Sequence, residues 1–165
     1  MFFKIIQLVY LAIFFLMAFG CVLFKNTDGK MWNHFRRSMA IKETSRKLYM
    51  MVLALAVLFH DLAFFKVYGP SLWQMPGFVF GLVLLRNSWS ETMLTLLRTN
   101  RLAQILAFAV VMISMIEQQL FTLSAAIGIL FAFSVGYPSR EVISMAEKNA
   151  KSGTLMDDAE IHRLY

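Results

Sequence analysis

The stretch LYMMVLALAVLFHDLAFFKVY, residues 48–68, decides the fold class of this chain. It is apolar apart from His60, Asp61 and Lys66, and a Gly-Pro-Ser turn follows it. An apolar run of this length can cross the hydrocarbon core of a bilayer as one helix. Further apolar runs lie on both sides of it, so the chain is expected to cross the membrane several times.

The composition of the whole chain indicates a membrane protein. Of its 165 residues 59% are hydrophobic, and its mean hydropathy is +0.62. Soluble domains reach about 45–50% apolar residues only when glycine is counted among them. The chain therefore has more apolar surface than one small soluble core can bury, and the excess is expected to face lipid.

The apolar runs predict five membrane segments. The first would span about 30 Å as a helix, and we interpret it as a retained membrane helix because the bulky Phe19 spoils a signal-peptide cleavage site before Cys21. A hairpin at Glu117 separates the last two segments, and four spans with a re-entrant third or fourth segment are an open alternative. The segments are 5–24, 48–68, 72–85 extending toward 97, 102–116 and 120–137, within a transmembrane domain of residues 1–137.

Basic residues indicate the orientation of these segments. All but two of the sixteen Lys and Arg residues lie in the stretches 25–47, 86–101 and 138–165; the exceptions are Lys4 and Lys66. Cytoplasmic loops carry an excess of Lys and Arg. We therefore expect an all-α polytopic membrane protein with its N-terminus outside and its C-terminus in the cytoplasm. The net charge of +6 is assigned to anionic lipid headgroups, and no specific nucleic-acid partner is expected.

The basic loop 25–47 also carries an apolar stripe. Trp32, Phe35 and Met39 recur three or four residues apart, with cations mostly between them. The pattern fits either an amphipathic helix in the cytoplasmic interface of the membrane or an ordinary solvated loop helix. The residues expected to contact headgroups or a docking partner are Arg36, Arg37, Lys42, Arg46 and Lys47.

The C-terminal stretch 138–165 is predicted to be a short soluble tail. Ser139 can cap a helix that runs to about Ser152, and Gly153 can end that helix. The basic residues of the tail place it on the same side of the membrane as the loop 25–47.

Small residues recur four apart on the last apolar segment, at Ser124, Gly128, Ala132 and Gly136. A helix face without bulky side chains lets another helix approach closely, which is a main source of helix association in lipid. The third segment adds the GxxxG pair Gly77 and Gly81. These faces are expected either to pack within one chain or to form an oligomer interface.

The second segment carries the candidate site. His60 and Asp61 lie about 10 Å inside the outer half of the membrane if the helix is straight, where ionisable residues are costly and often functional. One hypothesis is a proton relay or ion path, in which Asp61 titrates or binds a cation and His60 shuttles the proton. The alternative is a polar clamp, in which Asp61 is neutral or hydrogen-bonded to Lys66, Gln74 or a neighbouring subunit.

Sequence motifs of enzymes and cofactor sites are missing. The chain has no Walker loop, no GxSxG and no HExxH, and its Cys and His residues do not have the spacing of a metal site. Its single cysteine, Cys21, can form no intramolecular disulfide. We therefore expect neither an enzyme nor a bound cofactor.

Three functional hypotheses remain for a protein of the bacterial inner membrane. The leading one is a structural subunit of a larger membrane assembly, such as a secretion or conjugation apparatus or a defence or exclusion system. Its partners would be the lipid bilayer and other membrane subunits, in a homo- or hetero-oligomer. The second hypothesis is a homo-oligomeric pore of the holin or abortive-infection kind, and the third is a proton- or ion-coupled transport module.

Overall fold

The described part of the chain consists of helices joined by short links, without strands. The computed structural model describes Val9, Ala12, residues 30–69, Leu72, and residues 75–114 and 120–152. The prediction of an all-α protein is confirmed for these residues. Their helices are α2 (Lys30–Ile41), α3 (Glu43–Tyr68), α4 (Met75–Leu84), α5 (Asn87–Thr99), α6 (Arg101–Ser114), α7 (Phe121–Gly136) and α8 (Arg140–Ser152).

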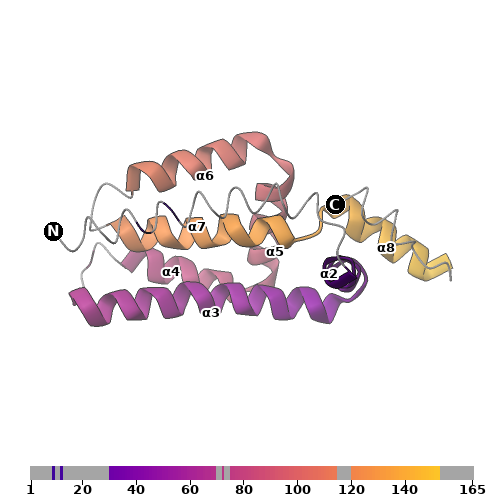
Figure 1. The fold of residues 1–165 in the computed structure, drawn as a ribbon, viewed down its shortest axis with the longest axis horizontal. Coiled ribbons are helices and arrows are strands. Elements are labelled where there is room, and N and C mark those ends of the chain that lie inside the picture. Colours follow the sequence, from indigo (N-terminus) through magenta and orange to yellow (C-terminus); the bar gives the residue numbers. More distant parts are fainter. Residues whose placement is uncertain are drawn as a thin grey trace.

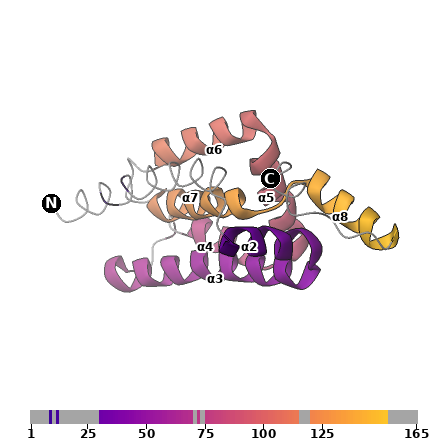
Figure 2. The same cartoon turned by 45° about the vertical axis from the view of Figure 1, so that its right-hand side comes forward.

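The helices form a bundle around α7. Figure 1 shows α3 and α6 on opposite sides of α7, with α4 between α7 and α3. At one end of the bundle α5 crosses it, and α2 and α8 lie at the same end (Figures 1 and 2). Because α7 contacts α3, α4, α5 and α6, it is the central helix of the fold.

The buried face of α3 follows from helical spacing. Its buried side chains recur three or four residues apart, which places them on one face of a helix; they are Arg46, Met50, Leu53, Ala54, Val57, Asp61 and Phe64. We call this set the core stripe of α3. The helix begins before the predicted residue 48, at Glu43, whose carboxylate lies 2.7 Å from the Lys47 ammonium. It ends at the predicted Tyr68, where Gly69 has a φ of 80° and its N–H donates to the Phe65 carbonyl.

The segment predicted over 72–85, which was expected either to continue toward 97 or to bend along the membrane face, is divided into two helices. α4 ends at Leu84, and α5 begins at Asn87 after an extended Arg86. Leu85 and Arg86 donate to carbonyls three residues back, which tightens the last turn of α4. The Ser90 hydroxyl then donates to the Leu84 carbonyl and holds α5 against that end. With ten residues, α4 is about 15 Å long, too short to cross a bilayer alone.

A sharp bend joins α5 to α6. The two helix axes differ by 104°, and Asn100 stands between them. Its side-chain oxygen accepts from the N–H groups of Leu102 and Ala103, at 2.9 and 3.3 Å, and so caps α6. The Gln104 amide donates back to the Leu97 carbonyl at 2.7 Å, which secures the bend from the other side.

Two helices of the described residues are long and apolar enough to cross a membrane. They are α3 and the stretch Phe121–Asn149, which joins α7 to most of α8. A third span results only if the bent pair α5 and α6 is counted as one. The five-span prediction is therefore met only in part, because α4 is too short and α6 follows a bend. The first predicted segment, residues 5–24, lies outside the described residues except for Val9 and Ala12.

The predicted tail is not detached from the bundle. Ser139 accepts from the Val142 N–H at 3.3 Å, as expected of a cap, and α8 runs from Arg140 to Ser152. Val142 and Ala146 are buried, and α8 packs against α2. The loop helix and the tail helix therefore cover each other. Gly153 and the rest of the tail lie outside the described residues.

Candidate functional site

Asp61 lies in the core of the bundle. Its place in the core stripe of α3 is four residues after Val57 and three before Phe64, so helical spacing directs it inward. None of its surface is exposed. It precedes the end of α3 at Tyr68 by about 10 Å, which places it away from the basic end of the bundle.

His60 is the hydrogen-bonding neighbour of Asp61. Nδ1 of His60 lies 3.3 Å from Oδ1 of Asp61, and 14% of the His60 side chain is exposed. The other carboxylate oxygen of Asp61, Oδ2, is buried and has no hydrogen-bond partner among the described residues. One oxygen therefore faces the histidine, while the second is available for a proton.

Aromatic rings surround the pair. The His60 ring lies 6.5 Å from that of Phe64 and 6.2 Å from that of Phe121 on α7, between ring centroids. Phe64 in turn stacks with Phe121 at 5.3 Å and contacts Tyr68 at 4.5 Å. These rings hold the imidazole in place and exclude water from the carboxylate side.

Lys66 does not join this site. It lies five residues after Asp61, about 140° further around the helix, and its side chain is exposed. The predicted bond between Asp61 and Lys66 is therefore not formed. Gln74, the other proposed partner, lies outside the described residues.

The energetics of the site favour a neutral or paired carboxyl. An ionised side chain in the interior of a membrane protein costs several kcal/mol, about 2.5–3.5 for Asp on insertion scales. A partner of opposite charge or a proton removes most of that cost. The one ionisable partner that the described structure places on Asp61 is His60, so the pair can share a proton.

The small residues of α4 pack inside the chain. A Cβ added to Gly77 would lie 2.8 Å from the backbone carbon of Thr122 on α7, and one added to Gly81 would lie 2.9 Å from the Leu58 side chain on α3. The absence of both side chains lets α4 fit between α3 and α7.

The small residues of α7 are likewise used within the chain. Ser124 donates to the Val111 carbonyl of α6 at 3.0 Å. A Cβ on Gly136 would lie 2.7 Å from the Tyr49 hydroxyl oxygen, which itself donates to the Phe133 carbonyl at 2.8 Å. Gly128 is buried and Ala132 is half-buried. Of the two expectations for this row, the described contacts show packing within one chain.

The predicted headgroup cations divide into two groups. Lys42 and Lys47 are exposed and Arg37 is half-buried, but Arg36 and Arg46 are buried, with 1% of Arg36 exposed. The expectation that all five meet lipid or a docking partner is therefore wrong for Arg36 and Arg46. The reason is tertiary packing, because α2 folds back between α3 and α8.

Two arginine side chains cap the C-terminal ends of helices. Nη1 of Arg46 donates to the carbonyls of Met39 and Ala40, at 3.3 and 3.0 Å, where α2 ends. Arg98 of α5 does the same for α7, donating to the Val135 carbonyl at 2.9 Å. Cations at helix C-termini are favourable because the last carbonyls lack partners in the helix.

Sequence reasoning missed several residues of these sites. Phe64 had a usable signal, because it lies one helical turn after Asp61. Phe121 had none, since it is sixty-one residues from His60 along the chain. The capping roles of Arg98 and Asn100 were missed because they depend on where α7 ends and where α6 turns.

The described structure holds no evident metal centre. Within residues 30–69, 75–114 and 120–152, no three His, Cys, Asp or Glu residues are placed to hold an ion. No family model, curated protein sequence or solved structure matches this chain. Its function is therefore argued from its own residues.

Proposed function

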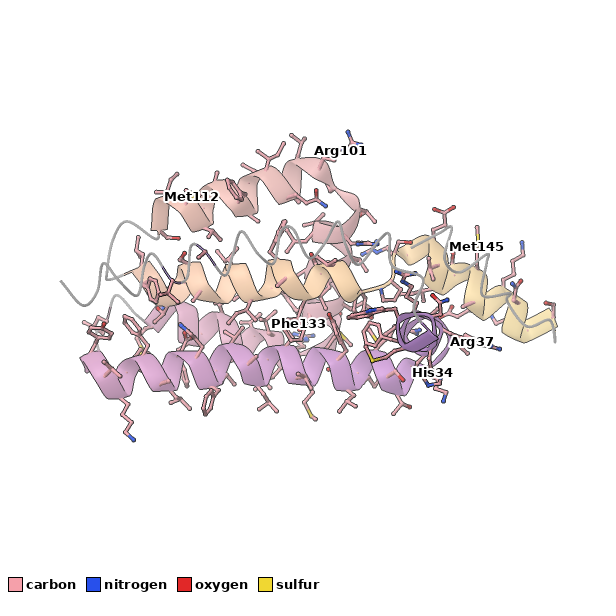
Figure 3. The ribbon with its side chains drawn as sticks, in the orientation of Figure 1. His34, Arg37, Arg101, Met112, Phe133 and Met145 are labelled. Carbon is pink, nitrogen blue, oxygen red and sulfur yellow. The ribbon has the colours of Figure 1, made fainter. Side chains whose placement is uncertain are left out.

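We propose that this protein is a non-enzymatic subunit of a membrane assembly, with its basic end at the cytoplasmic face. The observation that carries the proposal is the separation of charge from apolar surface. Every Lys and Arg of the described ranges except Lys66 lies in α2, α5, α8, the first turns of α3 or α6, or a link next to one of these helices. Figure 3 places Arg37 and Arg101 toward this end and Met112 toward the other.

The sides of the bundle support immersion in lipid. Large apolar side chains are exposed along α3 and α6, including Phe59 at 76% and Ile113 at 68%. Exposed apolar area on this scale marks a surface that meets lipid or another protein. Cations at one end suit the anionic headgroups of the cytoplasmic leaflet.

The outer face of α3 is the surface that we assign to a partner subunit. It carries a shallow apolar groove of about 640 Å³, lined by Val52, Leu55, Ala56, Leu58, Phe59 and Leu62. Gly77 and Gly81 on α4 and Ser124 and Gly136 on α7 already lie against other helices of the chain, so we place the partner on a different face. The small Ala56 between larger side chains leaves room for a helix of that protein.

The assembly that we propose is a secretion or conjugation apparatus, or a defence or exclusion system, in a bacterial inner membrane. Short loops, the lack of an N-x-S/T glycosylation sequon and a single cysteine favour a bacterial origin.

Photo-crosslinking in native membranes tests the partner surface. A photoreactive residue is placed at Leu55 or Phe59 on α3, with Leu106 on the exposed face of α6 as the matched control. We expect the α3 positions to crosslink to one protein of defined mass and the α6 position to crosslink to lipid. Lipid adducts from all three positions would contradict a partner on α3.

The same experiment separates the second hypothesis. A product of twice the 19.0 kDa chain mass would favour a homo-oligomer and with it the pore. Burial of Asp61 inside the bundle argues against a lumen between copies lined by this residue.

A proton- or ion-coupled transport module is the other candidate. It is favoured by the buried carboxyl of Asp61 beside His60. Transport would require the site to be reached from both sides of the membrane, and Asp61 lies much nearer to one end of α3 than to the other.

A further inference from the structure

We propose that His60 and Asp61 form a proton-binding pair in which His60, the more exposed partner, passes the proton to Asp61. The proton is held between Nδ1 of His60 and Oδ1 of Asp61, or on the second oxygen of Asp61. This inference goes beyond the role of a membrane subunit and does not depend on it.

The two side chains differ in exposure, and this difference sets the order in which a proton reaches them. Asp61 is fully buried, whereas His60 retains 14% exposure of its side chain. The two side chains are joined at 3.3 Å. A proton that enters the bundle therefore reaches the imidazole first and the carboxylate second, and it leaves by the reverse route. Stacking of His60 with Phe64 and its contact with Phe121 keep the imidazole at the carboxylate.

No charged side chain in the described structure other than His60 is placed to neutralise Asp61. Of the helices that pack against α3, α4 and α7 contain no ionisable side chain. The other two, α2 with its cations and α5 with Glu91 and Arg98, lie at the basic end of the bundle, away from the Tyr68 end of α3 (Figure 1). On α3 itself, Lys66 is exposed and Tyr68 lies two turns further along. Asp61 is therefore neutralised by the imidazolium of His60 or by a proton of its own.

The exchange is a simple acid–base step. Uptake of one proton from water converts imidazole and carboxylate into imidazolium and carboxylate, or into imidazole and carboxylic acid. The net charge of the pair changes from minus one to zero, and no electrons move. The protonated pair is neutral and therefore costs less free energy to bury than the charged pair. We expect the protonated pair to be the resting form.

Carboxyl NMR of the full chain tests the pair. Protein labelled with carbon-13 at the aspartate carboxyls is placed in lipid nanodiscs and titrated with acid and base. The other aspartates are Asp28, Asp157 and Asp158, so the spectrum is simple. The Asp61 signal is the one lost in Asp61→Asn, or in Asp61→Glu if the amide variant does not fold.

The expected result is an Asp61 signal that titrates and responds to His60. His60→Gln should change the pH response of this signal, because it removes the one ionisable side chain that the described structure places on Asp61. The matched control is His34→Gln on α2, which removes an exposed imidazole and should leave the midpoint in place. An Asp61 signal that stays constant wherever the protein is folded, or that shifts equally in both histidine variants, would overturn the proposal.

Discussion

Single residues of α3 and α4 define the interior of this protein. Asp61 occupies a position that the helical spacing would otherwise give to an apolar side chain, between Val57 and Phe64. Gly77 and Gly81 occupy positions where any side chain meets a neighbouring helix. Asp61 adds an ionisable group to an apolar core, whereas Gly77 and Gly81 allow the helices of that core to pack closely.

Substitution of the two glycines by alanine should have unequal effects. In Gly77→Ala the new methyl group lies 2.8 Å from backbone and side-chain atoms of Thr122, so α4 and α7 must separate. In Gly81→Ala the nearest atom is the end of the flexible Leu58 side chain at 2.9 Å, which can turn away. We expect Gly77→Ala to lower the free energy of unfolding by about 1–3 kcal/mol.

Thermal unfolding in mild detergent measures both variants. Gly81→Ala serves as the matched control, with a smaller loss of stability. Equal unfolding temperatures for the two variants would contradict the close packing of Gly77 against Thr122.

Whole elements are held together by arginine caps and by turns between short helices. Arg46 secures the end of α2, Arg98 the end of α7, and Asn100 the start of α6. These polar contacts all lie at the end of the bundle where α5 crosses it. Arg46 and Arg98 at this end therefore stabilise the fold itself.

Removal of the Arg46 cap should loosen α2. Arg46→Met keeps the length and apolar stem of the side chain but leaves the carbonyls of Met39 and Ala40 without their donor. Hydrogen bonds from a charged group contribute about 1.5–3 kcal/mol, so we expect a loss of that size and faster amide exchange in α2. Hydrogen–deuterium exchange with mass spectrometry measures it.

Its neighbour provides the control. Lys47→Met removes an exposed cation paired with Glu43, and solvent screening makes such a surface pair contribute little to stability. If both variants exchange equally fast in α2, the cap has no energetic role.

At the scale of the whole molecule, folding brings three basic stretches to one end. They are separated by apolar helices in the sequence, yet α2, α5 and α8 lie together at one end of the bundle (Figure 1). Lys66 is near the opposite end, where α3 stops. This polarity is the basis of the orientation that we propose.

Cysteine labelling should show the two ends on opposite sides of the membrane. In a Cys21→Ser background, Lys66→Cys should react with an impermeant thiol reagent added to intact cells, because its side chain is exposed at the outer end. Lys42→Cys, exposed at the basic end, should react only after permeabilisation. The reverse pattern would invert the orientation.

The sequence by itself determined the helical class and the apolar runs, and it identified His60 and Asp61 as a candidate site. Those features are local, since hydropathy and helical spacing act within a few turns; the end of α3 at Tyr68 and the Ser139 cap are of the same kind. Tertiary structure decided the rest. The break at Arg86 and the bend at Asn100 are held by hydrogen bonds between consecutive helices, from Ser90 to Leu84 and from Gln104 to Leu97. The burial of Arg36 depends on the packing of α2 against α8, which is far away in the sequence. Gly77 packs against Thr122, and Phe121 contacts His60, only when α7 lies between its neighbours. The spacing of residues within one segment cannot predict these contacts.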